Sequence, residues 1–289
     1  MLAQLPDADR VAEVVILHLP QRYRPRAQHV LRRVLLHRYL RRRLGARFRP
    51  VDTGPPAPPE LVAQTSVLYE RDIAVQADPD VYFAAGYLGA LMYLKTVEKF
   101  GFDLRTAKAV LDFGCGAAKR TRLFRGIQGV RVVGTDVNAA QIQWARKHVP
   151  GIEFHENGLE PPLRFAEGDT FDLVTAASVF THIPLDLQRP WLEEIRRILR
   201  PGGYFLCTVA GAHHIDIQLS PELQQRLQRE GHVTLAPEDA GVSYATKAAG
   251  SWDVFQTRAE VLRSFGSVFD VLHYSASETA QDNLVLRRS

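Results

Sequence analysis

The sequence predicts an α/β protein built on a doubly wound, mostly parallel sheet, with a helical extension before it. From residue 109 onward, short apolar runs of strand length alternate with amphipathic runs of helix length. The first apolar run leads into a glycine turn, Gly114 to Gly116, and a helix-favouring run with Lys119, Arg120 and Arg122 follows. A strand, a glycine turn and a helix in this order bring bare backbone N–H groups up to a ligand.

Length and composition are those of an ordinary globular chain. The 289 residues are 46% hydrophobic and 24% charged, and no apolar run approaches the roughly 20 residues that a membrane span needs. The chain starts with acidic residues where a secretory signal carries positive charge, so we expect a cytoplasmic protein. The two cysteines, Cys115 and Cys207, are too few for a disulfide scaffold or for a zinc site of their own, and we expect no metal.

Residues 1–60 are predicted to form a basic helical extension that ends in a proline-rich linker. Residues 1–52 hold twelve arginines and no lysine against four acidic residues, a net charge of +8, so the rest of the chain carries −4. Helical spacing predicts an amphipathic helix over residues 26–44, whose apolar residues are Val30, Leu31, Val34, Leu35, Tyr39, Leu40 and Leu44.

Two interpretations stay open for the arginine-rich face of this helix. In the first, the face is solvated while the helix packs on the main domain. In the second, it docks on something anionic, either a membrane surface or an acidic partner protein. A nucleic acid is the less favoured anionic partner, because few aromatic residues are interleaved with the arginines.

Residues 61–108 are predicted to be a mostly helical segment before the first strand. Pro79 interrupts the helical pattern, and a long helix rich in aromatic and small residues is expected from Tyr82 to Phe100. The aromatic side chains of Tyr82, Phe83 and Tyr87 belong either to the core or to a cover over a ligand cleft.

The sheet and its helices follow in order over residues 109–289. Strands are expected at residues 109–111, 130–134, 152–155, 171–176 and 204–209, and helices at residues 139–148 and 187–199. Asn138 is the expected N-cap of the first of these helices. An insertion at about residues 211–253 contains one predicted helix, 221–229. A capping box of Thr257 and Glu260 begins the last helix, 257–265, and strands at 268–274 and 284–287 end the chain.

The glycine turn is compatible with two kinds of nucleotide ligand. A dinucleotide-binding turn needs a third glycine three residues after Gly116, and that position holds Lys119. Asp112 would also lie near a pyrophosphate, where negative charge is unfavourable. A ligand that carries a positive amino group explains Asp112 better.

At this turn the chain resembles the class I S-adenosylmethionine (SAM)-dependent methyltransferases. Their first motif, acid-x-G-x-G-x-G, corresponds to the residues from Asp112 to Ala118, with Ala118 in place of the third glycine. Five further matches follow in order, so the resemblance covers about residues 82–288. It implies a Rossmann-like fold of seven strands, the last one antiparallel, with a helical cap at residues 61–108 over the cofactor cleft.

The resemblance also implies which residues bind SAM. Asp136, at the end of the second strand, accepts hydrogen bonds from both ribose hydroxyls, and Asn157 with Gly158 meets the adenine amino group. Cys115 is expected to fill space in the turn. The residues expected to bind the cofactor are Asp112, Gly114, Cys115, Gly116, Asp136, Val137, Asn157, Gly158, Ala177 and Ser178.

Methyl transfer needs an acceptor aligned with the sulfonium methyl group, and a hydroxyl acceptor also needs a base. His182 follows the fourth strand, where the resembled enzymes place residues beside the methyl group, and it is the first candidate for a base or an orienting group. A bracing role in its loop is the alternative. His213 and His214, with Asp216 close by, follow the fifth strand and are the second candidates.

The acceptor is less clear from the sequence. The cap and the insertion carry four aromatic residues as candidate substrate contacts, Tyr82, Tyr87, Tyr244 and Trp252. We expect methyl transfer to a hydroxyl group of a small molecule, natural product or glycan. One alternative is a nucleic-acid or protein methyltransferase recruited by the basic segment, although no NPPY-type tetrad follows the fourth strand. The other alternative is a non-catalytic subunit that binds a partner protein. The presence of Asp112 and Asp136, two residues expected to bind the cofactor, argues against this alternative.

Overall fold

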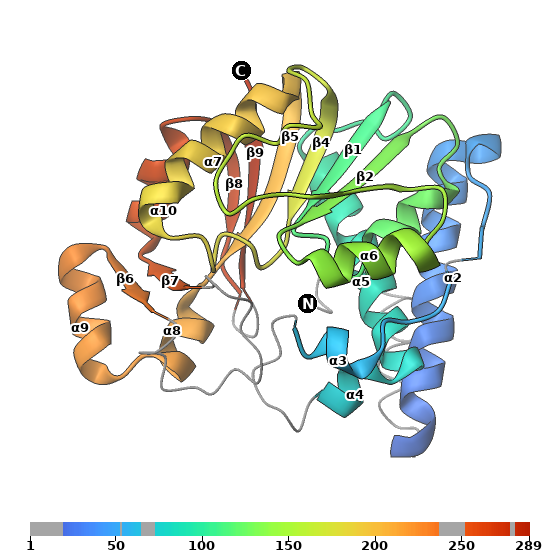
Figure 1. Ribbon diagram of the computed structural model, residues 1–289, viewed down its shortest axis with the longest axis horizontal. Helices are drawn as coiled ribbons and strands as arrows, with labels where there is room; N and C mark the ends of the chain where they lie inside the picture. Colours follow the sequence, from blue (N-terminus) through green and yellow to red (C-terminus); the bar gives the residue numbers. More distant parts are fainter. Residues whose placement is uncertain (1–19, 53, 65–72, 237–251, 278–280) are drawn as a thin grey trace.

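The computed structural model describes residues 20–52, 54–64, 73–236, 252–277 and 281–289. They form a central sheet with helices on both faces and a smaller two-stranded sheet beside it (Figure 1). Among these described residues, no helix is both long and apolar enough to cross a membrane.

Seven strands make the central sheet, in the order β3-β2-β1-β4-β5-β9-β8. Their bounds are β1 Ala109–Phe113, β2 Arg131–Asp136, β3 Glu153–Glu156, β4 Phe171–Ala176, β5 Leu199–Val209, β8 Asp270–Ser275 and β9 Asp282–Arg287. The first five strands run parallel to one another, whereas β9 is antiparallel to both β5 and β8. The predicted seven-stranded sheet with an antiparallel last strand is therefore confirmed. The strand order reverses between β1 and β4, and ligands bind at the carboxyl ends of such strands.

Two hydrophobic cores lie on opposite faces of this sheet, because side chains alternate along each strand. Val110 of β1 packs with α5 (Pro79–Lys99) and α2 (Arg24–Leu44), while Leu111 packs with α7 (Leu185–Ile198) and, through the same cluster, α10 (Arg258–Gly266). The helix α6 (Ala139–His148) buries Ile142 and Ala145 in a third, smaller cluster. The expected caps are confirmed, since the side chains of Asn138 and Thr257 accept hydrogen bonds from the first turns of α6 and α10.

The basic helix α2 is present, but its apolar residues do not all face inward. Leu36 and Leu40 are buried in the core that α2 shares with α5, and Arg43 forms a 2.9 Å ion pair with Glu98 of α5. Val30 and Val34 were expected on the same apolar face, and the structure leaves them 55% and 52% exposed. The expected face was wider than the surface that α5 can cover.

The insertion after β5 is richer in structure than expected. Besides the predicted helix, α9 (Pro221–Glu230), it contains α8 (Ala212–Gln218) and an antiparallel pair of strands, β6 (His232–Leu235) and β7 (Asp253–Gln256). Its own small core includes Leu227, Val233 and Phe255. The sequence missed the two strands because they pair across a long intervening segment rather than through a short turn.

The segment after the glycine turn is also different from the expected α-helix. Only a short 3-10 helix, η5 (Thr121–Gly126), follows the turn. At this point the buried Arg122 donates hydrogen bonds from its guanidinium to the backbone carbonyls of Ala117 and Ala118, each 2.8 Å long, and so fixes the end of the turn. The remaining short elements before β1 are η2 Gln21–Tyr23, η3 Gly45–Arg47, α3 Pro59–Val62 and α4 Ile73–Ala77.

Candidate active site

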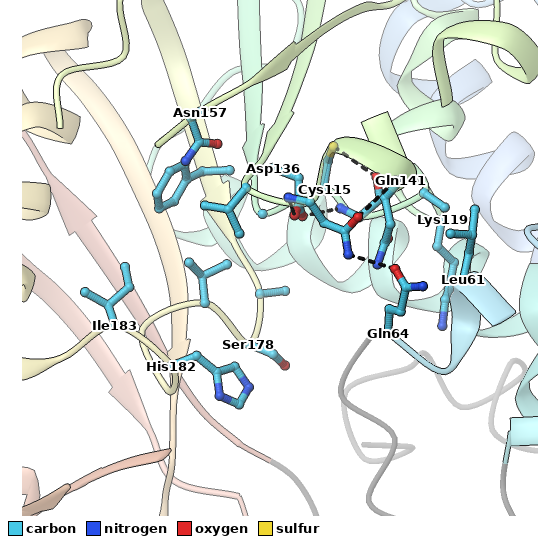
Figure 2. A pocket seen from close by; sticks show the side chains of 18 of the residues that line it. Leu61, Gln64, Cys115, Lys119, Asp136, Gln141, Asn157, Ser178, His182 and Ile183 are labelled. Carbon is cyan, nitrogen blue, oxygen red and sulfur yellow. Dashed lines mark hydrogen bonds between the residues drawn. The ribbon is translucent and has the colours of Figure 1, made fainter. Parts of the chain in front are cut away.

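A cleft of about 530 Å³ lies at the carboxyl ends of β1, β2, β3 and β4. Residues that follow these strands line it, among them Cys115, Asp136, Asn157 and Ser178, and Leu61 of α3 lies beside them (Figure 2). Trp252 completes the lining. Of the residues expected to bind the cofactor, all but Asp112 contribute to its lining: Gly114, Cys115, Gly116, Asp136, Val137, Asn157, Gly158, Ala177 and Ser178. The fold thus brings motifs from four separate strand ends, those of β1, β2, β3 and β4, to one cleft.

Both carboxylate oxygens of Asp136 accept hydrogen bonds from the backbone. One carboxylate oxygen accepts a 2.8 Å hydrogen bond from the N–H of Gly116, and the other accepts a 2.9 Å hydrogen bond from the N–H of Asn138. Burial raises the pKa of Asp136, an effect that these two backbone donors partly oppose. Each carboxylate oxygen keeps further acceptor capacity for hydroxyl groups of a ligand.

The turn after β1 has a backbone that only glycine adopts easily. Gly114 has a φ of +74° and Gly116 one of +53°. A Cβ atom on Gly114 would lie 2.3 Å from Cγ2 of Val179, which belongs to the loop after β4. The glycines therefore allow the turn and the loop after β4 to approach each other closely.

Asp112 lies beneath the cleft rather than on its wall. Its buried carboxylate accepts hydrogen bonds from the hydroxyls of Thr121, at 2.6 Å, and Thr175, at 3.0 Å. The structure thus gives this side chain local hydroxyl partners, and it does not place the carboxylate where we expected it to meet an amino group. Asp112 joins the turn to β4 and holds it in place.

The region expected to hold an adenine ring combines one polar and two apolar side chains. The side-chain oxygen of Asn157 accepts a 2.8 Å hydrogen bond from the hydroxyl of Thr135, which fixes its amide beside the cleft. Val137 and Leu159 also line the cleft and are 41% and 54% exposed. Leu159 was not singled out from the sequence, although an exposed leucine after a strand end is the kind of residue on which a base packs.

Lys119 lines the cleft, although the sequence did not single it out as a site residue. It lines the cleft on the side of Leu61, across from His182 and Ser178 (Figure 2), and its Nζ lies 5.2 Å from the centre of the Tyr82 ring. Burial lowers the pKa of Lys119 to about 8, and the nearby Arg120 adds to this effect. A partly buried ammonium group in a cleft is suited to bind an anionic ligand group.

His182 stands on the opposite side of the cleft with two oxygen atoms behind its ring. Its Nδ1 lies 2.9 Å from the backbone oxygen of Trp252 and 3.4 Å from Oδ1 of the buried Asp253. The backbone N–H of Val254 also donates to the oxygen of Thr181. These contacts attach β7 and the residue before it to the loop after β4, so the insertion forms one wall of the site.

The other candidate residues are distributed differently. Tyr82 and Trp252 line the cleft, as expected of substrate contacts, but Tyr87 packs instead against His29 and His37 of α2. Tyr87 follows Tyr82 by five residues, which turns it to another side of the helix. Tyr244 lies outside the described residues.

His213 and His214 are not part of the cleft lining. Both stand in α8, with their rings 5.5 Å apart, and α8 turns away from the sheet into the insertion. Their expected role beside the methyl group is therefore not supported by their position. Within the described part of the chain, no group of three or more histidine, cysteine or acidic side chains is arranged to hold a metal ion.

The sheet order, the glycine turn and a carboxylate at the end of β2 define an α/β fold of the nucleotide-binding type. The model of a methyltransferase domain family matches residues 87–248, more than half of the chain. The chain therefore belongs to the class I SAM-dependent methyltransferase family, and its cofactor is SAM. A solved structure, the PH0226 protein of Pyrococcus horikoshii OT3, shares the fold. It has a TM-score of 0.51 and 18% identity and covers 70% of this chain and 91% of that chain.

Two curated relatives have lipids in their names. Sterol 24-C-methyltransferase ERG6B of Gibberella zeae is 32% identical over 165 residues, which are 51% of this chain and 40% of that protein. Fatty-acid O-methyltransferase of Mycolicibacterium smegmatis is 28% identical over 166 residues, which are 56% of this chain and 54% of that protein. The chain thus spans about half of the length of these relatives or less.

Proposed function

We propose that this protein is a SAM-dependent methyltransferase that acts on a hydroxyl group of a small molecule, natural product or glycan. The observation that carries the proposal is the position of His182. The imidazole lines the same cleft as Asp136 and Lys119, on the side away from Lys119, with its Nδ1 turned toward oxygen atoms.

The residues of the cleft fit SAM in its three chemically distinct parts. The carboxylate of Asp136 accepts hydrogen bonds from the ribose hydroxyls, and Val137 with Leu159 offers apolar surface to the adenine ring. The ammonium group of Lys119, which lines the same cleft, would pair with the carboxylate of the methionyl end. When bound, SAM supplies a methyl group that its sulfonium activates for transfer.

The contacts of His182 decide which of its nitrogens is basic. Both atoms near Nδ1 are oxygen acceptors, the carbonyl of Trp252 and the carboxylate of Asp253, so Nδ1 carries the proton in the neutral ring. Nε2 then holds the lone pair and would accept the proton of the acceptor hydroxyl, while bound SAM would give up its methyl group to the hydroxyl oxygen and leave as the neutral thioether. The resulting imidazolium is stabilised by the negative charge of Asp253.

The walls near His182 favour an acceptor with apolar parts. Ile183, Leu187, Trp191 and Trp252 line the cleft together with His182. Sterols and fatty acids, which appear in the names of the two relatives, are therefore the first acceptor classes to test. We place this reaction in the cytoplasm, because the two cysteines are free and buried, as in proteins of a reducing compartment.

The proposal is tested with methyl-labelled SAM and a panel of acceptors that includes sterols, fatty acids, glycans and a small-molecule extract. Mass spectrometry identifies any labelled product. We expect a labelled hydroxyl compound, and we expect His182→Gln to lower the rate of its formation roughly a hundredfold while SAM still binds. His213→Gln, outside the cleft lining, is the control and should keep the rate. Full activity of His182→Gln, or label only on nitrogen or carbon, contradicts the proposal.

A further inference from the structure

The helix α2 presents a second apolar stripe to the outside of the molecule. Tyr23, just before the helix, and Val30 and Val34 within it are 52%, 55% and 52% exposed, and their spacing of seven and four residues puts them on one side. The opposite side of α2 is the one that buries Leu36 and Leu40 against α5. The exposed stripe is therefore not needed for the core.

Arginines surround this stripe. Residues 22–47 contain ten arginines and no acidic residue. Those that are exposed near the stripe are Arg22, Arg26, Arg33, Arg38 and Arg41. We call Tyr23, Val30, Val34 and these five arginines the outer face of α2. The acidic partners that α5 offers to α2, Asp80 and Glu98, contact its other side through His29 and Arg43.

The combination of exposed valines and arginines decides which anionic surface fits. A nucleic-acid backbone pairs with arginines but offers no apolar surface to valines. Nucleic-acid binders also present several aromatic rings on which bases stack, and this face has one. A membrane surface accommodates both kinds of side chain. Valines and a tyrosine enter the boundary between head groups and acyl chains, and arginines pair with anionic head groups.

We propose that the outer face of α2 docks the protein on a membrane surface that contains anionic lipids. The N-terminal end of α2 lies at the same end of the molecule as α3, whose residues line the cleft (Figure 1). A protein docked through this end of α2 holds its cleft near the membrane. Docking of this kind does not depend on the identity of the methyl acceptor.

Vesicle co-sedimentation of the full chain tests the proposal. The vesicles consist of phosphatidylcholine alone or of phosphatidylcholine with phosphatidylglycerol. We expect roughly tenfold stronger binding to the anionic vesicles at low salt, and a marked decrease when salt is added. Replacing Val30 and Val34 by glutamine, or Arg26 and Arg33 by glutamine, should each lower binding to the anionic vesicles several-fold.

The insertion provides a matched control at the far end of the molecule from α2 (Figure 1). Ile217 is 49% exposed and the Arg229 side chain 73% exposed, so the double variant Ile217→Gln/Arg229→Gln removes one apolar and one cationic group. It should bind vesicles like the natural protein. Calorimetry with SAM checks that all variants keep a folded cleft, and failure of SAM binding in the natural protein would concern the methyltransferase proposal alone.

Three results would overturn the docking proposal. The first is equal binding, or no binding, to the two kinds of vesicle. The second is salt-sensitive binding to duplex DNA or RNA that the α2 variants abolish while vesicles are not bound. The third is a dimer in sedimentation velocity that dissociates in the valine variant, because the outer face would then be an interface between two copies of the chain.

Discussion

The carboxylate of Asp136 accepts a hydrogen bond from the backbone N–H of Gly116, with 2.8 Å between the two heavy atoms. This bond joins the end of β2 to the glycine turn after β1. The acid that we propose for the ribose hydroxyls therefore also fixes the glycine turn, which is part of the proposed cofactor site. A single contact thus couples the shape of the turn to the chemistry of the cleft.

Replacing Gly114 with alanine tests the shape of the turn. The added Cβ would lie 2.3 Å from Cγ2 of Val179, and the φ of +74° is unfavourable for alanine. We expect Gly114→Ala to lower SAM affinity at least tenfold in calorimetry. Gly168→Ala is the matched control, since its nearest neighbouring atom is at 3.5 Å, its φ is not positive and it lies outside the cleft lining. Equal affinities of these two variants would disprove the role of the close approach.

Lys119 should lower the stability of the folded protein and strengthen the binding of the cofactor. The pKa of Lys119 is about 8 in the folded protein, whereas the ordinary lysine value of 10.5 holds in the unfolded chain. Between these two pH values the unfolded chain therefore binds more protons than the folded protein, and the free energy of unfolding rises as the pH rises. At pH 7 the charged lysine carries its full burial cost. We expect Lys119→Met to be more stable than the natural protein at pH 7, by about 1–3 kcal/mol in urea unfolding.

The same variant should bind SAM about tenfold more weakly, because the carboxylate of the ligand loses its cation. In the natural protein, SAM affinity should also decline as the pH rises through about 8, where Lys119 loses its charge. The decline should be smaller in Lys119→Met. A variant that gains stability but keeps full affinity would show that Lys119 does not contact the ligand.

Asp253 should act through His182 rather than through the substrate. Its carboxylate lies 3.4 Å from Nδ1 of His182, so Asp253→Asn removes the charge that stabilises the imidazolium. We expect kcat for methylation of the acceptor to fall tenfold or more while KM for SAM stays the same. Asp216→Asn, in α8, is the control. A change in KM for SAM without a change in kcat would assign Asp253 to the cleft wall instead.

Arg122 should be a large contributor to stability. The side chain is buried between the rings of Tyr82 and Trp144 and donates hydrogen bonds to three backbone carbonyls, those of Pro55, Ala117 and Ala118. We expect Arg122→Met to lower the free energy of unfolding by about 3 kcal/mol, because buried carbonyls lose their donor. Arg125→Met, at a more exposed position of η5, should cost about 1 kcal/mol or less. Similar losses in both variants would contradict this role.

The strands of the sheet and the starts of two helices could be predicted because short sequence patterns determine them. Apolar runs of strand length mark β1 to β5, and the side chains of Asn138 and Thr257 mark the starts of α6 and α10. The cleft lining near Asp136 and Asn157 was predictable for a related reason. Residues at the carboxyl ends of neighbouring parallel strands meet at one edge of a sheet whatever the rest of the chain does.

Contacts between distant segments could not be predicted in this way. The pairing of β6 with β7, the hydroxyl partners of Asp112 and the position of Asp253 behind His182 all depend on segments far apart in the sequence. Helical spacing likewise could not divide the apolar residues of α2 between two sides. Leu36 packs on α5 and Val30 faces outward because of where α5 lies, which the sequence of α2 does not contain.

Calorimetric titration of the natural protein and of Asp136→Ala with SAM tests the cofactor site most directly. We expect saturable binding of one SAM per chain, at least tenfold weaker in the variant, since the hydroxyls of the ribose lose a charged acceptor. Because burial raises the pKa of Asp136, binding to the natural protein should weaken with acid at a higher pH than for an ordinary aspartate. Absence of binding to the natural protein, or equal affinity in Asp136→Ala, would contradict a SAM site held by this carboxylate.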